Sequence, residues 1–188
     1  RDAGAGVSLS VPIEMNMAHG TPPVIKAMQM GVRPSLSSDV ECTLAADPFM
    51  QMRSAMSLQR MFVNANKLGE TNMPPTGALP LLTSKDVLGW ATMNGARDLR
   101  LDKKVGSLTP GKRADLILVR TNDINVAPFI NPALLLVQQA NPYNVDTVVI
   151  DGRILKHKGE LVAIDTEEVI NKAAEAFHAA RKRAGGPY

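Results

Sequence analysis

The sequence predicts an α/β protein, and two patterns support this class. Within the first forty residues a strand, a helix and a second strand follow one another closely, which is the order of a parallel crossover unit. The second half contains short β-rich segments joined by two-residue turns, which is typical of antiparallel pairing. With 188 residues, 45% of them hydrophobic and 21% charged, the chain is long enough to bury a sizeable core.

The crossover unit begins at residues 6–11, where apolar and polar side chains alternate until a proline is expected to end the strand. A helix is predicted from Pro22 to Met30, with Thr21 as its N-cap. Gly31 is expected to end that helix. A short second strand then follows Gly31 and ends at Asp39.

A carboxylate follows each of these strands: Glu14 after the first and Asp39 after the second. Because the carboxyl ends of parallel strands open on one rim, where α/β proteins collect their chemistry, both side chains are functional candidates. Asp is also well suited to cap a following helix. From its position alone, Asp39 is therefore either a site residue or an N-cap.

Two helix starts are expected in the next segment. Asp47 and Pro48 predict the start of a long helix, rich in Met, whose apolar face belongs to the core. Residues 69–80 are rich in Gly and Pro and are expected to form an irregular loop. Thr83, with Asp86 three residues later, predicts the start of another helix.

The second half is expected to pair antiparallel, because its strands lie close together in the sequence. Residues 114–119 and 145–150 are β-rich, and Asp151-Gly152 is a strong hairpin signal. A second turn, Lys158-Gly159, is expected to lead into a strand at residues 161–164.

Two helices accompany these strands in the prediction. A short one at residues 133–139 interrupts the strand series, and Asp165 is expected to cap a terminal amphipathic helix. The residues assigned to the inner face of that helix are Val169, Ala173, Ala176, Phe177 and Ala180.

Charge and composition argue against several classes of partner. The net charge is only +3, and the basic cluster at residues 181–183 suits a solvated last helical turn, so no nucleic-acid partner is expected. No apolar run is long enough to span a membrane, so no membrane partner is expected. The single cysteine, Cys42, excludes an internal disulfide and favours a cytoplasmic location.

Residues 106–117 read Gly-Ser-Leu-Thr-Pro-Gly-Lys-Arg-Ala-Asp-Leu-Ile and carry a resemblance to a known family. They are preceded by Ala-Thr-Met-Asn-Gly-Ala at 91–96 and followed by Val-Ile-Asp-Gly-Arg at 149–153. Together these segments resemble the amidohydrolase superfamily, in particular its cytosine-deaminase-like and chlorohydrolase branch of metal-dependent hydrolases.

The resemblance implies a (β/α)8 barrel that carries one or two divalent metal ions, zinc or iron, at its carboxyl rim. In that family histidines of earlier strands and an aspartate of the eighth strand hold the metal, and the family pattern places that aspartate at Asp39. Asp39 would then be both metal ligand and catalytic base, accepting a proton from the metal-bound water. The implied reaction is hydrolysis of a carbon–nitrogen bond, as in deamination of a nucleobase-like or triazine-like ring.

The same resemblance implies that the chain is a fragment. It has three histidines and no His-x-His pair, and a complete barrel takes about 250 residues. Residues 1–105 would form barrel strands seven and eight with their helices. Residues 106–164 would form the C-terminal part of a composite β-sandwich, and residues 165–188 a terminal helix.

Such a fragment is expected to be inactive by itself. It is also expected to associate, either as a homo-oligomer or with the missing N-terminal part, because an unclosed barrel leaves strand edges and helix faces open. The side chains expected to be partly exposed are Met28, Met52, Met56 and Met61. The alternative is a non-catalytic structural or assembly module.

Three further residues are candidates for binding the small-molecule substrate. Glu14 stands where the family pattern usually has an asparagine, so it would present a carboxylate in place of an amide. His19 lies in the loop that follows, where it either reaches the substrate or is satisfied by solvent or backbone. Glu41, two residues beyond Asp39, is a candidate for the same pocket.

Overall fold

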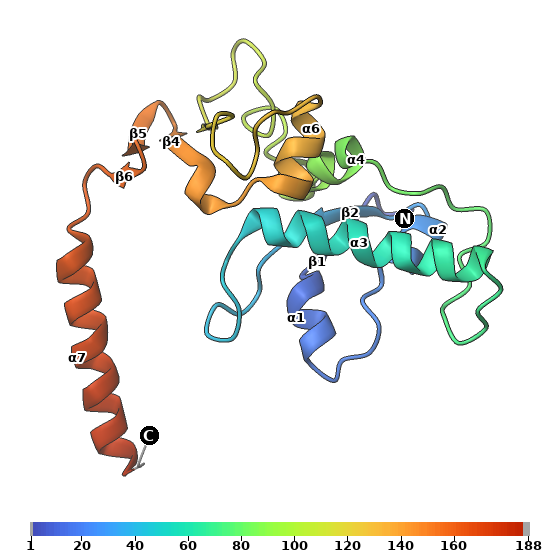
Figure 1. The fold of residues 1–188 in the computed structure, drawn as a ribbon, viewed down its shortest axis with the longest axis horizontal. Helices are drawn as coiled ribbons and strands as arrows, with labels where there is room; N and C mark the ends of the chain where they lie inside the picture. The colour runs from blue at the N-terminus through green and yellow to red at the C-terminus, as the bar shows by residue number, and fades with distance from the viewer. Residues whose placement is uncertain (1, 186–188) are drawn as a thin grey trace.

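The computed structural model describes residues 2–185, and Figure 1 shows two sheets connected by helices. The strands are β1 (Gly6–Leu9), β2 (Arg33–Leu36), β3 (Leu116–Val119), β4 (Val145–Ile150), β5 (Arg153–His157) and β6 (Glu160–Leu161). The α-helices are α1 (Val11–Asn16), α2 (Val24–Gln29), α3 (Pro48–Lys67), α4 (Ser84–Gly89), α5 (Gly95–Asp98), α6 (Pro132–Leu134) and α7 (Thr166–Ala184). Two π-helical segments, η1 (Trp90–Asn94) and η2 (Leu135–Gln139), and a 3-10 turn, η3 (Pro142–Asn144), complete the structure.

The predicted parallel unit is confirmed. β1 and β2 pair in parallel, with Gly6 opposite Arg33 and Leu9 opposite Leu36, and α2 lies in the connection between them. The carboxyl ends of the two strands are therefore neighbours. In the part of the chain that the structure describes, this sheet has two strands, and the barrel is not closed.

The first strand is shorter than the prediction. β1 ends at Leu9, whereas Val11 and Pro12 already form the first turn of α1, with Ser10 at the N-cap. A proline does not disturb the first helical turn, because its missing N–H would have no partner there. The proline at position 12 thus begins a helix instead of merely ending a strand.

The start of α2 also differs from the prediction. Thr21 is not the N-cap, because the helix begins at Val24 with Pro23 at the N-cap position. A residue before a proline is disfavoured in the α-helical region, so Pro22, which precedes Pro23, does not serve as the first helical residue. Gly31 follows the helix with a φ of 63°, as a helix-ending glycine should.

α3 is the centre of the core and was predicted well. Its N-cap is Asp47, whose side chain accepts a hydrogen bond from the backbone N–H of Phe49 at 2.9 Å. Figure 1 shows α3 lying across the first sheet, and it contacts α1, α4 and η2 as well. These neighbours bury Met52 and Met56, which are only 4% and 3% exposed, so the prediction that they are partly exposed is wrong.

The other two methionines of that prediction behave differently. Met28 is partly buried against the core, and Met61 is 45% exposed, so for these two the expectation of partial exposure is confirmed. Met52 and Met56 are buried because α3 packs against α1, α4 and η2 even though the barrel is open. Met28 belongs to another helix, α2.

The segment at 69–80 is irregular, as expected, and a buried amide of α3 holds its end. Gln59 is fully buried; its Nε2 donates to the Pro80 carbonyl at 2.8 Å, and its Oε1 accepts from the Leu82 N–H at 3.0 Å. The predicted capping box follows, with Thr83 and Asp86 each bonding the other's backbone N–H. The helix that it starts runs through η1 into α5.

The second sheet is antiparallel in the order β3-β4-β5-β6, which confirms the prediction for the second half. Both predicted turns are present, with positive φ at Asp151 and Gly152 and again at Lys158 and Gly159. The last strand is shorter than predicted. β6 ends at Leu161, and beyond it one hydrogen bond, from Val162 N–H to the Leu155 carbonyl, continues the pairing.

A buried polar cluster fixes the start of β4. Asn144 is fully buried, and its Nδ2 donates to Asp123 at 2.8 Å and to Asn125 at 2.9 Å. Arg120 donates to both carboxylate oxygens of Asp123 and to the Tyr143 carbonyl. The hydrogen bonds from Arg120 and then from Asn144 lower the pKa of the Asp123 carboxyl, and the bond to Asp123 raises the pKa of Arg120.

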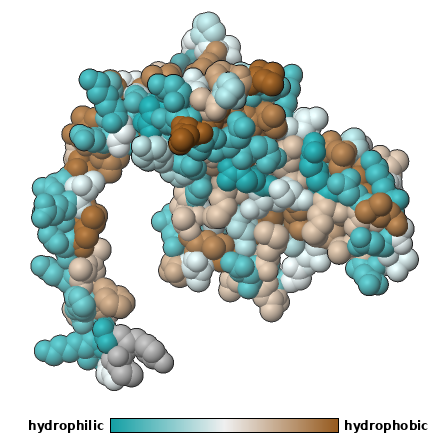
Figure 2. All heavy atoms as spheres, viewed as in Figure 1, coloured by the Kyte–Doolittle hydropathy of each residue, from teal (hydrophilic) through white to brown (hydrophobic). Residues whose placement is uncertain are grey.

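The predicted short helix is present as α6 and η2, with Asn131 as its N-cap. The terminal helix, α7, begins at its predicted cap, because the Glu168 N–H donates to the Asp165 carboxylate at 3.0 Å. Its predicted inner face is wrong, since α7 has no buried residue; Phe177, for instance, is 60% exposed. Figure 1 shows the helix apart from the rest of the fold, and Figure 2 shows apolar side chains exposed along it.

None of the helices in residues 2–185 is both long enough and apolar enough to cross a membrane.

Candidate functional site

The carboxyl ends of β1 and β2 are joined directly after the last paired residues. The Ser37 N–H donates to the Leu9 carbonyl at 2.9 Å, which continues the sheet by one residue. The hydroxyls of Ser10 and Ser37 then lie 2.5 Å apart and share a hydrogen bond. This pair of serines fixes the two strand ends relative to each other, and the candidate residues Glu14 and Asp39 follow them in the chain.

Asp39 lies two residues beyond that serine pair, is exposed, and has a φ of 58°. Positive φ is uncommon for residues other than Gly, although Asp and Asn tolerate it better than most. The next helix is α3, and Asp47 caps it. The sequence left open that Asp39 is the N-cap of the next helix, and the structure excludes this. Its carboxylate lies beyond the end of β2 and caps no helix.

Glu14 lies in α1 and folds back over the end of β1. Its Oε1 accepts a hydrogen bond from the Ser10 N–H at 2.9 Å. Its Oε2 is buried and has no hydrogen-bond partner among the described residues. Burying an acceptor without a donor is costly, so Oε2 is the atom at which an N–H or O–H donor would be most stabilising.

His19 and Glu41 lie in exposed loops after α1 and after Asp39. The backbone N–H of His19 donates to the Met17 carbonyl at 2.7 Å. Within residues 2–185, no hydrogen bond or ion pair joins the side chain of either residue to Asp39. The structure thus brings Glu14 to the joined strand ends through Ser10, whereas His19 and Glu41 remain candidates by position only.

The residues described here do not by themselves form a metal site. Across residues 2–185 no three His, Cys, Asp or Glu side chains are grouped so that they could hold an ion. The Asp39 carboxylate is a suitable oxygen donor, but a catalytic zinc ion takes about three protein ligands. Asp39 is therefore one candidate ligand, and residues 2–185 do not complete a metal site by themselves.

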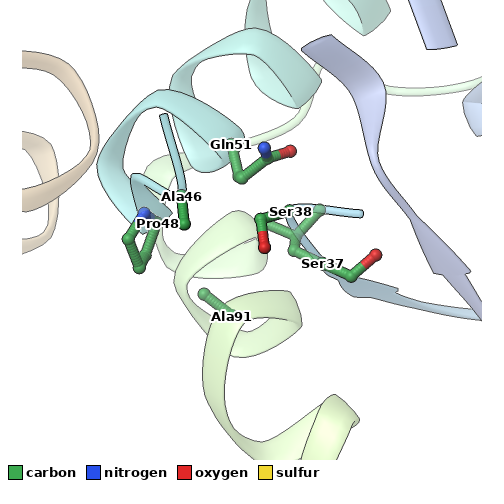
Figure 3. A pocket seen from close by; sticks show the side chains of 7 residues that line it. Ser37, Ser38, Ala46, Pro48, Gln51 and Ala91 are labelled. Atoms are coloured by element: carbon green, nitrogen blue, oxygen red, sulfur yellow. The ribbon is translucent and has the colours of Figure 1, made fainter. Parts of the chain in front are cut away.

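A pocket with a volume of about 170 Å³ lies beside the end of β2. It is lined by Leu36, Ser37 and Ser38 from the strand end, by Ala46, Pro48 and Gln51 around the start of α3, and by Ala91 of η1. Figure 3 shows Gln51 and Ser38 on one side of this space and Ala46, Pro48 and Ala91 on the other. The pocket was not predicted from the sequence. The small residues before Asp39 are the sequence feature that could have indicated it.

The family model of the Amidohydrolase family matches residues 2–155. The 5'-deoxyadenosine deaminase of Methanothermobacter thermautotrophicus is 36% identical over 171 residues, which are 90% of this chain and 36% of that protein. The 5-methylthioadenosine/S-adenosylhomocysteine deaminase of Desulforudis audaxviator is 32% identical, again over 90% of this chain and over 37% of its own length. The chain thus spans a little over a third of these relatives.

Solved structures show the same fold. An adenosine deaminase from Xanthomonas campestris with bound zinc matches 96% of this chain and 38% of its own, with a TM-score of 0.81 and 22% identity. The zinc complex of atrazine chlorohydrolase from Arthrobacter aurescens matches 93% of this chain and 36% of its own, with a TM-score of 0.69 and 20% identity. The match of the family model over most of the chain, with these relatives, shows that the chain belongs to the amidohydrolase family.

Proposed function

We propose that this chain is the part of a metal-dependent hydrolase that supplies Asp39 to the active site. The reaction is hydrolysis of a carbon–nitrogen bond that is not a peptide bond, specifically the deamination of a nucleobase-like ring. The observation that carries this proposal is the position of Asp39: an exposed carboxylate at the carboxyl end of β2, with the capping role taken by Asp47. The deaminase names of the relatives support the reaction class.

Asp39 has two roles in the proposal. In the complete protein it would be one ligand of a divalent ion, zinc or iron, and its carboxylate would accept a proton from the attacking water. The ion, when bound, lowers the pKa of that water toward neutrality. Zinc is the first candidate, because both solved structures described above contain it.

Glu14 is proposed to bind the substrate through Oε2. That atom is a buried acceptor without a donor among the described residues, and a ring N–H or an exocyclic amino group would supply one. His19 and Glu41, exposed in the neighbouring loops, are proposed to contact the outer part of the substrate.

The test uses the complete product of the gene that encodes this chain. The purified protein, loaded with zinc, iron or manganese, is incubated with 5'-deoxyadenosine, adenosine, cytosine and an amino-triazine, and release of ammonia is measured. We expect metal-dependent release from at least one of these compounds. If every compound is stable with every metal, the protein is instead the non-catalytic assembly module.

The 188-residue chain by itself is expected to be inactive, since one carboxylate does not hold a catalytic divalent ion. Turnover by the isolated chain above a metal-only blank would contradict this. We further propose a cytoplasmic location, and association either with a second copy or with the remaining part of the same enzyme.

A further inference from the structure

The terminal helix α7 has a regular apolar seam that no part of residues 2–185 covers. The seam side chains follow one another at alternating steps of three and four residues: Ile170, Ala173, Phe177, Ala180 and Ala184. Ile170 is 66% exposed and Phe177 is 60% exposed. Figure 1 shows the helix apart from both sheets, and Figure 2 shows apolar side chains along it. Alternating steps of three and four are the spacing at which two helices pair along a narrow seam.

The order of large and small side chains on the seam fits a second copy of α7 that runs in the opposite direction. In an antiparallel pair centred at the level of Glu175, Phe177 lies against Ala173 of the second copy, and Ile170 lies against Ala180. Each large side chain then meets a small one, as a closely packed helix pair requires. A parallel pair would place Phe177 against Phe177 and Ala173 against Ala173, which alternates overpacked layers with gaps.

The charges at the two ends of α7 favour the same direction. Its first turn is acidic, with Glu167 and Glu168, and its last turn is basic, with Arg181, Lys182 and Arg183. Antiparallel pairing brings the acidic turn of each copy beside the basic turn of the other, whereas parallel pairing brings like charges together. The same charges suit the dipole of a single helix, so the choice of partner rests on the seam and the charges together.

We infer that the α7 seam is a dimerisation surface that binds a second copy of this chain in an antiparallel helix pair. The pair has two-fold symmetry and uses the same surface of both copies, so association through it stops at two. The 19 residues of α7 form a helix only about 28 Å long, so we expect a dimer that dissociates reversibly on dilution. The inference does not depend on the proposed deamination, because the number of subunits is measured without turnover.

Sedimentation of the 188-residue chain over a range of concentrations tests the dimer. Phe177→Glu should weaken dimerisation by about tenfold or more, because the pair would bury a carboxylate without a partner. Ala179→Glu is the matched control, since it adds the same charge on the opposite side of the helix and should leave the equilibrium unchanged. Both positions are exposed, so both variants should keep the circular dichroism of the native chain.

Two cysteine variants test the direction of the pair. Both are made in a chain in which Cys42, the single native cysteine, is replaced by Ser. Position 176 lies beside the seam and next to the two-fold axis, so Ala176→Cys should form a disulfide between two copies under mild oxidation. Ala179→Cys, on the opposite side of the helix, should not.

The complete product of the gene distinguishes a second copy from the rest of the same polypeptide as the occupant of the seam. We expect Phe177→Glu to lower the number of subunits in the complete protein, and Ala179→Glu to leave it unchanged. If Phe177→Glu lowers only the thermal unfolding temperature, the rest of the polypeptide covers the seam and the inference is overturned. A 188-residue chain that stays monomeric, equal dimerisation of the two Glu variants, or equal disulfide formation at positions 176 and 179 would overturn it as well.

Discussion

At the scale of single residues, the fold lowers the pKa of the Asp123 carboxyl. Bonds from Arg120 and Asn144 lower its pKa below the value in the unfolded chain, which is about 3.9. A lowered pKa in the folded state means that the stabilisation is complete above the unfolded pKa and is lost as pH falls through the folded pKa. This contribution is therefore present at neutral pH and is lost progressively as the pH falls below about 4.

Replacing Asp123 with Asn tests this pH dependence. The variant keeps the shape of the side chain and an oxygen for Asn144, but it loses the charge opposite Arg120. We expect Asp123→Asn to lower the free energy of unfolding at pH 6, and the gap from the native chain to narrow at pH 3. Urea denaturation at both pH values measures it, and a gap that is independent of pH would show that the ion pair contributes nothing.

Gly106 and Gly111 form a matched pair for a test of packing. Their φ values are 88° and 90°, so a side chain strains the backbone at either position, by about 1–2 kcal/mol. A Cβ on Gly106 would lie 2.8 Å from the Ala96 Cβ, whereas a Cβ on Gly111 would meet nothing within 4 Å.

Gly106→Ala should therefore destabilise the chain by about 1–3 kcal/mol more than Gly111→Ala, through overpacking against Ala96. Thermal and urea unfolding of the two variants provide the comparison. Equal losses would mean that the contact between Gly106 and α5 is not tight in solution.

Individual site residues differed in how far the sequence could reveal them. The position of Asp39 after a predicted strand was enough to nominate it, because strand order alone places it at the rim. Gln51 could not be found in this way. Its place on α3 is an ordinary core position, and only the three-dimensional fold shows that its amide oxygen has no partner.

At the scale of elements, starts set by a local side-chain bond were predictable. Asp47, Thr83 and Asp165 each bond a backbone N–H within three residues, so the few letters around them contain the signal. The starts of α1 and α2 were missed because prolines near them allow more than one reading. Burial was harder to predict than helix starts. The sequence of α7 has an apolar stripe, yet no residue of the helix is buried.

The exposure of α7 leads to a prediction about this element. Deleting residues 165–188 should leave the thermal unfolding of the monomeric chain unchanged, because none of the described residues of α7 is buried within it. As a positive control, Leu9→Ala, at a side chain with no exposed surface, should cost about 2–5 kcal/mol. A large loss of stability on deletion would mean that α7 packs against the fold in solution.

At the scale of the whole molecule, exposed apolar surface predicts association. Side chains such as Ile154, Val162, Ile170 and Phe177 are each more than half exposed, and they lie on β5, after β6 and on α7. Large exposed apolar patches are rare on soluble monomers, so this number of exposed apolar side chains favours association. The isolated chain should therefore form dimers or larger assemblies in light scattering, and a monodisperse 20 kDa particle that unfolds cooperatively would contradict this expectation.

The role of Asp39 in the complete gene product is the most direct test of the proposed function. Asn is the replacement of choice, since it tolerates the positive φ at this position and removes only the charge. Glu70→Gln, in the exposed loop after α3, is the control. We expect Asp39→Asn to reduce ammonia release by about a hundredfold or more with unchanged thermal unfolding, while Glu70→Gln keeps full activity. A folded Asp39→Asn enzyme that retains more than about a hundredth of the activity would contradict the assignment of Asp39 as metal ligand and catalytic base.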